Sequence, residues 1–346
     1  MISAFAVIVI HVSGANWSRL EIGSFNWIVQ TFYNLAGRFS VCVFCMITGA
    51  LMLRPDRELA ARDVIGRYIR RILIIFAAWV VLYAAFYTAL DHGDVKYFVS
   101  RLFRLPDHLW YLMMLMGMYL AYPVLRRIAA DRAITRYMIW LLVAYGVLDT
   151  VTRVTGSFAD VAGERYGYAL WKDFLNNLDN MKAAFIPGYL ACFLMGHYIH
   201  EYGLGKWHRR VVYAAIPALA LSAALTIWLS GLAEKRVYAF MMETNPLIFL
   251  ASAGIFAFFR ARDAENGAPD RSPRLTKAVV WLGAHTFGIY LIHFAVRDGL
   301  AGWLGFDVTS YPALLSVPLN SLLIFIVSLG LAVLMKKIPG VRRIVS

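Results

Sequence analysis

Apolar stretches alternate with short polar segments along the whole of this 346-residue chain. Ten such stretches can be delimited, near residues 2–13, 26–53, 72–91, 109–125, 137–152, 183–199, 211–231, 245–259, 278–296 and 313–335. Most of them reach the ~20 residues that a helix needs to cross a membrane. With 60% hydrophobic and only 16% charged residues, the chain could not cover a water-soluble surface. The pattern predicts an all-α polytopic membrane protein, a single domain over residues 1–346 with about ten transmembrane helices.

The lysines and arginines gather on alternate sides of these stretches. The segments after the second, fourth, sixth and eighth stretches, together with the C-terminus, hold about two thirds of the 34 basic residues. An excess of basic residues marks the cytoplasmic side, so both termini are predicted to be cytoplasmic. This bias and the attraction of anionic lipid headgroups explain the net charge of +13. The charge is spread over five separate loops and does not indicate a nucleic-acid partner.

The segments between the stretches are mostly short, with two exceptions. The segment from about Arg153 to Lys182 is predicted to be an external loop of mixed polar and aromatic character. The segment around Asp263–Arg274 is predicted to be a flexible cytoplasmic linker. Neither indicates a separate soluble domain.

The first stretch is shorter than a membrane span. Residues 1–12 extend only ~18 Å as a helix, against a hydrocarbon core of ~30 Å. The stretch lacks the basic flank and the cleavage site of a signal peptide. It is either a short, tilted or partly inserted helix, or the remainder of a longer one. We expect the second, with a natural chain that begins upstream of Met1.

Known catalytic and metal-binding motifs are absent from the sequence. It has no Gly-rich phosphate loop, no H-E-x-x-H and no G-x-S-x-G elbow. Cys42 and Cys45 have a C-x-x-C spacing, but they and Cys192 lie inside apolar stretches without further candidate ligands. We therefore interpret the three cysteines as small packing residues and predict no metal site.

Several polar side chains fall inside the stretches, and the predicted orientation assigns each a depth. His11 lies near the outer end of the first stretch, and Arg38 near the middle of the second. His108 stands at the outer mouth of the fourth, and His293 towards the outer end of the ninth. An arginine near the centre of a helix costs roughly 2.5–3.5 kcal/mol and normally faces a partner or a wet cavity. Three histidines and one arginine from four helices are thus predicted to share the outer half of the membrane.

Structural interpretations of the same residues remain open. Arg38 could clamp backbone carbonyls or a carboxylate of a neighbouring helix. His108 and His293 could bond to headgroups or water near the interface. His285 could cap the ninth helix or contact an anionic cytoplasmic ligand. The remaining helix-end histidines are interpreted as interfacial, namely His197, His200 and His208.

The chemistry that such a group supports is limited. A histidine can take a proton from a hydroxyl at neutral pH. An arginine can hold an anionic group or stabilise charge on a carbonyl oxygen. The sequence shows a base and an electropositive group but no evident Ser or Cys nucleophile. This combination suits direct transfer of an acyl group to an alcohol, without a covalent intermediate on the enzyme.

At these residues the chain resembles the acyltransferase family 3 proteins, the multi-pass membrane O-acyltransferases of bacteria. The resemblance runs nearly end to end and includes ISAFAVIVIH, GRFSVCVFCMITGALML, HLWYLMMLMGMYLAYPVL and HTFGIYLIHF. Length and the HLW block look most like the enterobacterial common antigen O-acetyltransferase branch. Three departures stand out. The arginine of the family's first helix would fall one position before Met1, Thr48-Gly49 replaces Ser-Gly, and Cys42 replaces a proline.

The resemblance implies a bacterial inner-membrane enzyme that uses a cytoplasmic acyl-CoA, usually acetyl-CoA, to modify a hydroxyl of an envelope or surface glycan. It implies that His11 is the catalytic base, and it matches Arg38 to the arginine of the family's second helix. We expect the acceptor side to be lined by His108, Trp110, Tyr290 and His293. The alternative is a transporter or flippase of a lipid-linked glycan, although the sequence shows no paired, interrupted half-helices. A catalytically inactive descendant that binds or senses the same ligands ranks third.

Overall fold

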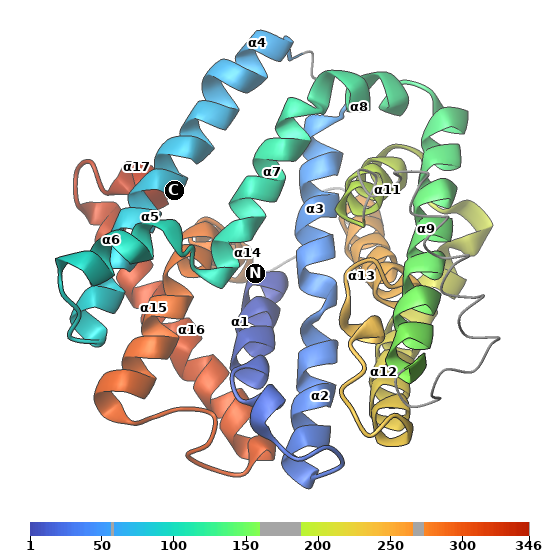
Figure 1. The fold of residues 1–346 in the computed structure, drawn as a ribbon. Helices are drawn as coiled ribbons and strands as arrows, with labels where there is room; N and C mark the ends of the chain where they lie inside the picture. Colours follow the sequence, from blue (N-terminus) through green and yellow to red (C-terminus); the bar gives the residue numbers. More distant parts are fainter. Residues whose placement is uncertain (57–58, 160–187, 266–272, 346) are drawn as a thin grey trace. The chain divides into compact units, whose positions relative to one another are not determined.

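The structure, a computed structural model, describes residues 1–56, 59–159, 188–265 and 273–345 (Figure 1). These residues are 83% helical and contain no strand, which confirms the predicted all-α class. The chain divides into two compact units. Unit 1 comprises Met1–Val12, Glu58–Leu125 and Pro269–Ser346, and unit 2 comprises Ser13–Arg57 and Arg126–Ala268.

Unit 1 is built from helices that come from both ends of the chain. Its long helices are α5 (Arg70–Leu90), α15 (Thr286–Leu304) and α16 (Ala313–Lys337), and α15 packs on both others. The shorter ones are α1 (Ile2–Gly14), α4 (Ala61–Asp63), the π-helical η2 (Val64–Ile69), α6 (Val95–Phe103), η3 (Asp107–Leu109), α7 (Trp110–Leu120), α14 (Pro273–Gly283) and α17 (Arg342–Val345). Helix α8 (Tyr122–Ala129) carries the chain from unit 1 to unit 2.

Unit 2 is centred on α3 (Phe39–Met52), which packs on α11 (Tyr189–Tyr202) and α13 (Pro246–Glu265). Helix α12 (His208–Leu232) packs on α13 and on α2 (Phe25–Gly37), and α9 (Arg132–Ala159) packs on α11. Three 3-10 turns complete the unit, namely η1 (Trp17–Arg19), η5 (Gly205–Trp207) and η6 (Ala239–Met241).

Two glycines permit the close approach of α3 and α11 in unit 2. A Cβ atom on Gly49 would overlap the carbonyl of Phe193, and one on Gly196 would overlap the backbone of Met46. Small residues at such crossings let helices pack backbone to backbone, as in many membrane proteins. Gly49 belongs to the Thr48-Gly49 pair of the family-like segment, so this position has a packing reason.

Six of the described helices are long and apolar enough to cross a membrane, and eight spans result if each of two bent pairs counts as one. The pairs are Val95–Leu120 with α8, bent by 65°, and Thr276–Gly283 with α15, bent by 58°. Helices α1 and α11 coincide with two predicted stretches but have only 13 and 14 residues. The count of about ten and the cytoplasmic termini stay predictions.

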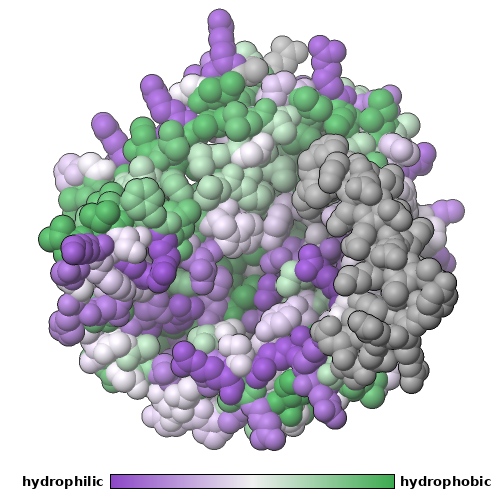
Figure 2. Space-filling view, viewed as in Figure 1, coloured by the Kyte–Doolittle hydropathy of each residue, from purple (hydrophilic) through white to green (hydrophobic). Residues whose placement is uncertain are grey.

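Long apolar side chains lie exposed on the span helices. On α16 they include Leu315, Leu319 and Ile326, each more than half exposed. Such surfaces appear as green areas in the space-filling view (Figure 2). Because water does not accommodate contiguous apolar patches of this kind, they are suited to contact lipid.

The stretch 26–53 is confirmed as one candidate span, Phe25–Met52, in which the single residue Arg38 separates α2 from α3. Two expectations about segment boundaries were wrong. The loop expected from Arg153 is helical as far as Ala159, where α9 ends. The linker expected from residue 263 is helical to the end of α13. The remainders of that loop and linker fall mainly in 160–187 and 266–272, outside the described residues.

Candidate functional site

Three histidines that are far apart in the sequence contact one another in unit 1. His11 comes from the last turn of α1, His108 from η3 and His293 from α15. The ring centroids of His11 and His293 are 5.4 Å apart, and those of His108 and His293 are 5.2 Å apart. We call these three residues the histidine cluster.

Aromatic rings enclose the histidine cluster. The ring of His108 stacks on that of Phe294 at 4.4 Å, and the ring of His11 meets Phe294 at 4.6 Å. Tyr83 of α5 lies 5.1 Å from His108 and donates its hydroxyl hydrogen to the Leu291 carbonyl at 2.8 Å. These contacts hold the imidazoles in a largely apolar environment at fixed positions.

Several imidazole nitrogens of the cluster are buried without a hydrogen-bond partner. His108 and His293 are each only 1% exposed. Nδ1 of His293 lies 2.6 Å from the Tyr290 carbonyl oxygen, whereas its Nε2 and both ring nitrogens of His108 have no hydrogen-bond partner within the described part of the chain. Buried polar atoms are nearly always satisfied in folded proteins, so a group of unsatisfied nitrogens points to a ligand.

The two other residues expected on the acceptor side differ in their relation to the cluster. The Tyr290 hydroxyl donates to the His108 carbonyl oxygen, and its ring lies 5.6 Å from that of His108. Trp110 is 37% exposed and contacts Tyr111, whose ring in turn lies against Tyr290. Tyr290 therefore contacts the histidine cluster directly. Trp110 reaches Tyr290 only through the ring of Tyr111.

Arg38 lies in unit 2, at the joint between α2 and α3. Its Nε donates to Asn34 Oδ1 at 2.9 Å, and its Nη1 lies 3.2 Å from Glu243 Oε1. The two charged side chains are each about one-fifth exposed. The partner is thus a carboxylate, as the structural interpretation of Arg38 supposes. The pair is not sealed from solvent, so the functional interpretation also stays open.

Glu243 belongs to an irregular segment, residues 233–245, that leads from α12 to α13. Thr244 donates to Asp149 Oδ2 at 2.7 Å, and the side-chain oxygen of Asn245 accepts from the Leu247 backbone amide at 2.7 Å. Val237, Ala239 and Asn245 are almost fully buried. Buried residues thus alternate with more exposed ones in this segment, and side-chain hydrogen bonds hold its C-terminal end.

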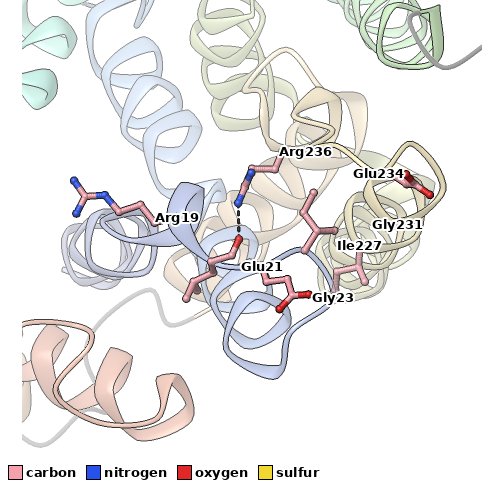
Figure 3. A pocket seen from close by; sticks show the side chains of 9 residues that line it. Arg19, Glu21, Gly23, Ile227, Gly231, Glu234 and Arg236 are labelled. Atoms are coloured by element: carbon pink, nitrogen blue, oxygen red, sulfur yellow. Dashed lines mark hydrogen bonds between the residues drawn. The ribbon is translucent and has the colours of Figure 1, made fainter.

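A cleft of about 580 Å³ opens in unit 2 between residues 19–23 and the end of α12 with the segment that follows it. Arg236 bridges the two walls by donating to the Leu20 carbonyl oxygen (Figure 3). Glu21 and Glu234 are among the residues that line the cleft, and Glu234 has a left-handed backbone with φ of 50°. The cleft therefore offers both acceptors and donors of hydrogen bonds within a small volume.

Two further histidines, His197 and His285, each have one ring nitrogen near a backbone carbonyl oxygen. His197, expected at the interface, is instead 1% exposed, and its Nε2 lies 3.1 Å from the Ala129 carbonyl oxygen. His285 does not cap α15 through its side chain. Its Nδ1 lies 2.7 Å from the Trp281 carbonyl oxygen at the end of α14.

Three residues of the site were missed by sequence reasoning, namely Tyr87, Asp298 and Glu243. Arg297 and Asp298 of α15 form an ion pair at 2.7 Å beside the histidine cluster, and the Tyr87 hydroxyl donates to Asp298 at 2.6 Å. Arg297 lies one turn beyond His293 on the same face of the helix, as its spacing in the sequence predicts. Glu243 precedes the eighth apolar stretch, where nothing in the sequence distinguishes it from a loop residue.

Comparison with protein families places these features in context. The acyltransferase domain model Acyl_transf_3 matches residues 1–337 and thus spans both units. Neither a search of curated proteins nor a search of solved structures found a match. Because the family match covers nearly the whole chain, the protein belongs to acyltransferase family 3, a family of membrane acyltransferases.

Proposed function

We propose that the protein is an O-acyltransferase of the bacterial inner membrane that moves an acyl group, most simply acetyl from acetyl-CoA, to a hydroxyl of an envelope or surface glycan. His11 serves as the general base. The acceptor class that we propose is a glycan of the enterobacterial common antigen kind. The observation that carries the proposal is the contact of His11 with His293, and of His293 with His108, in an aromatic enclosure.

The reaction needs a base, a place for negative charge and a leaving thiol. The acceptor hydroxyl oxygen attacks the thioester carbonyl carbon while His11 takes the hydroxyl proton. The carbon–sulfur bond then breaks, the ester forms, and the thiol of CoA leaves with a proton returned from the imidazole. Positive charge near the carbonyl oxygen stabilises the tetrahedral intermediate. The family-like sequence of the second stretch, and not a contact with the histidine cluster, is what suggests Arg38 for this role.

The cleft of unit 2 supports a polyhydroxylated acceptor. Carboxylates such as those of Glu21 and Glu234 accept hydrogen bonds from sugar hydroxyls, and the Arg236 guanidinium can donate to them. A volume of about 580 Å³ lies within the ~300–1,000 Å³ of small-molecule sites. In the chain, the first wall of this cleft follows soon after the helix that carries His11.

Transfer of radiolabel tests the proposal directly. Purified protein is incubated with radiolabelled acetyl-CoA and a panel of bacterial envelope polysaccharides, and label in the polysaccharide is counted. General-base catalysis typically contributes 10²–10⁴-fold, so His11→Ala should lower turnover by roughly 1000-fold.

His92→Asn is the matched control for that variant. His92 is exposed in the turn after α5 and has a φ of 52°, a conformation that asparagine tolerates. The His92→Asn variant should transfer label at the wild-type rate. Wild-type turnover in His11→Ala would remove the base assignment. Absence of transfer from acetyl-CoA to every polysaccharide by the wild-type protein would remove the proposed activity.

One observation favours the transporter alternative. Two bent helix pairs are present among the described residues, and interrupted spans are common where transporters bind their substrates. The same assay separates the two functions. A transporter would move a lipid-linked glycan across vesicle membranes without covalent transfer of label.

A further inference from the structure

A row of hydrogen bonds runs from α5 to the backbone of His11, entirely within unit 1. The Tyr87 hydroxyl donates to Asp298 Oδ2 at 2.6 Å. The other oxygen of Asp298 accepts from Arg297 Nε at 2.7 Å. Nη1 of Arg297 donates to the carbonyl oxygen of His11 at 3.3 Å. Asp298 thus holds the Arg297 guanidinium, which in turn contacts the backbone of His11, the candidate base.

The carbonyl that Arg297 reaches belongs to the last turn of α1, which ends at Gly14. A cation at this end of a helix is also favoured by the helix dipole. Because α1 has only 13 residues, it depends on tertiary contacts for its stability. The contact with Arg297 therefore stabilises the turn that carries His11.

Arg297 also acts on the ring of His11 through Phe294. The guanidinium carbon lies 4.0 Å from the centroid of the Phe294 ring, which meets the His11 ring at 4.6 Å. A guanidinium stacks on an aromatic face more readily than an ammonium does. One side chain thereby fixes both the backbone of His11 and the ring against which its imidazole rests.

We propose that Arg297 is a positioning residue for His11, held in place by Asp298 and Tyr87. This rests on the proposed function, in which His11 is the general base. Arg297 does not itself handle a proton or bind a substrate. It sets the depth and rotation of the imidazole at the end of α1, and a displacement of about 1 Å there can lower the rate roughly 100-fold.

Arg297→Lys tests the proposal because it keeps the charge and loses the planar fork that reaches Asp298 and His11 together. In the radiolabel assay with the best polysaccharide acceptor, kcat should fall roughly 10- to 100-fold. KM for acetyl-CoA and for the acceptor should stay unchanged. In a His11→Ala background the same substitution should no longer lower the residual turnover, because residues that act as a unit are not additive.

Arg153→Lys is the matched control. Arg153 also donates through Nε to an aspartate, Asp149, at 2.9 Å, but it belongs to unit 2. It should leave kcat at the wild-type value. If Arg297→Lys folds poorly, Asp298→Asn is the milder variant, since the amide oxygen can still accept one of the two hydrogen bonds. It should lower kcat in the same direction by a smaller factor.

Backbone hydrogen exchange gives a readout that does not depend on activity. The backbone amides at the end of α1 should exchange several-fold faster in Arg297→Lys than in the wild-type protein. Their exchange rates should be unchanged in Arg153→Lys. Unchanged exchange together with wild-type kcat would overturn the proposal. A higher KM at unchanged kcat would also overturn it, because Arg297 would then bind a substrate. If the wild-type protein transfers no label at all, the proposed function fails, and the exchange data alone decide whether Arg297 holds the end of α1.

Discussion

Polar side chains have different neighbours in the two compact units of the chain. In unit 2, partly exposed charges are paired: Arg38 meets Glu243, and Asp149 meets both Arg153 and Thr244. In unit 1, His293 packs on His11 and on His108 among aromatic rings, and ring nitrogens of His108 and His293 are unpartnered within the described residues.

This difference separates two uses of polarity in a membrane. Partly exposed ion pairs contribute modestly to stability, so the paired charges of unit 2 help to hold helices and the irregular segment 233–245 in place. The imidazoles of unit 1 are grouped, and the unpartnered nitrogens of His108 and His293 can accept a proton or a hydrogen bond from a substrate. We therefore assign proton transfer to unit 1 and a largely structural and electrostatic role to the charges of unit 2.

The largest expected effect compares one buried histidine from each unit. His293 and His197 are both 1% exposed, and each has one ring nitrogen near a backbone carbonyl and the other without a hydrogen-bond partner among the described residues. His293→Gln should lower turnover roughly 100-fold because it changes the neighbour of the base. His197→Gln should lower the melting temperature and leave the turnover of folded protein unchanged. Labelled transfer and thermal unfolding are measured on both variants. Equal losses of turnover would break the distinction between the units.

The second effect sharpens the assignment of Arg38. Arg38→Lys keeps the charge but loses bidentate geometry, so turnover should fall roughly tenfold if Arg38 stabilises charge on the substrate carbonyl. Glu243→Gln leaves Arg38 charged and should lower stability more than turnover, since a charge pair is broken.

Thermal unfolding and turnover on both variants decide between the two interpretations. If Arg38→Lys and Glu243→Gln lower the melting temperature equally and leave turnover alone, the pair is only a structural clamp.

Composition and periodicity were sufficient to predict the fold class, because a helix that crosses lipid must satisfy its backbone internally and show an apolar surface. They could not predict the break at Arg38, where α2 and α3 are joined by one residue whose amide bonds back to Leu35. Nor could they indicate that α9 continues to Ala159, because its last turns are polar and carry threonines bonded to their own helix backbone, such as Thr155.

The candidate site was partly accessible from the sequence. His11, His108 and His293 stood out because imidazoles inside apolar stretches are unusual, and their depths in the predicted topology coincide. Asp298 and Glu243 did not stand out, because an acidic residue at the end of a stretch looks like an ordinary loop residue. Their importance comes from tertiary contacts with Arg297 and Arg38, which a single sequence does not show.

The smallest expected effect concerns the cleft of unit 2. If Glu21 and Glu234 accept hydrogen bonds from the acceptor hydroxyls, replacing either by glutamine weakens one charge-assisted hydrogen bond. The glutamine side chain keeps the size and shape of the glutamate side chain. The acceptor KM should then rise about three- to tenfold, the effect of roughly 1 kcal/mol, while kcat and the KM for acetyl-CoA stay unchanged. Glu201→Gln, on α11 and outside the cleft, is the control and should leave all three constants unchanged. A rise in the KM for acetyl-CoA instead would assign the cleft to the donor. Unchanged constants in both cleft variants would show that unit 2 contributes its paired charges alone and that the acceptor is held elsewhere.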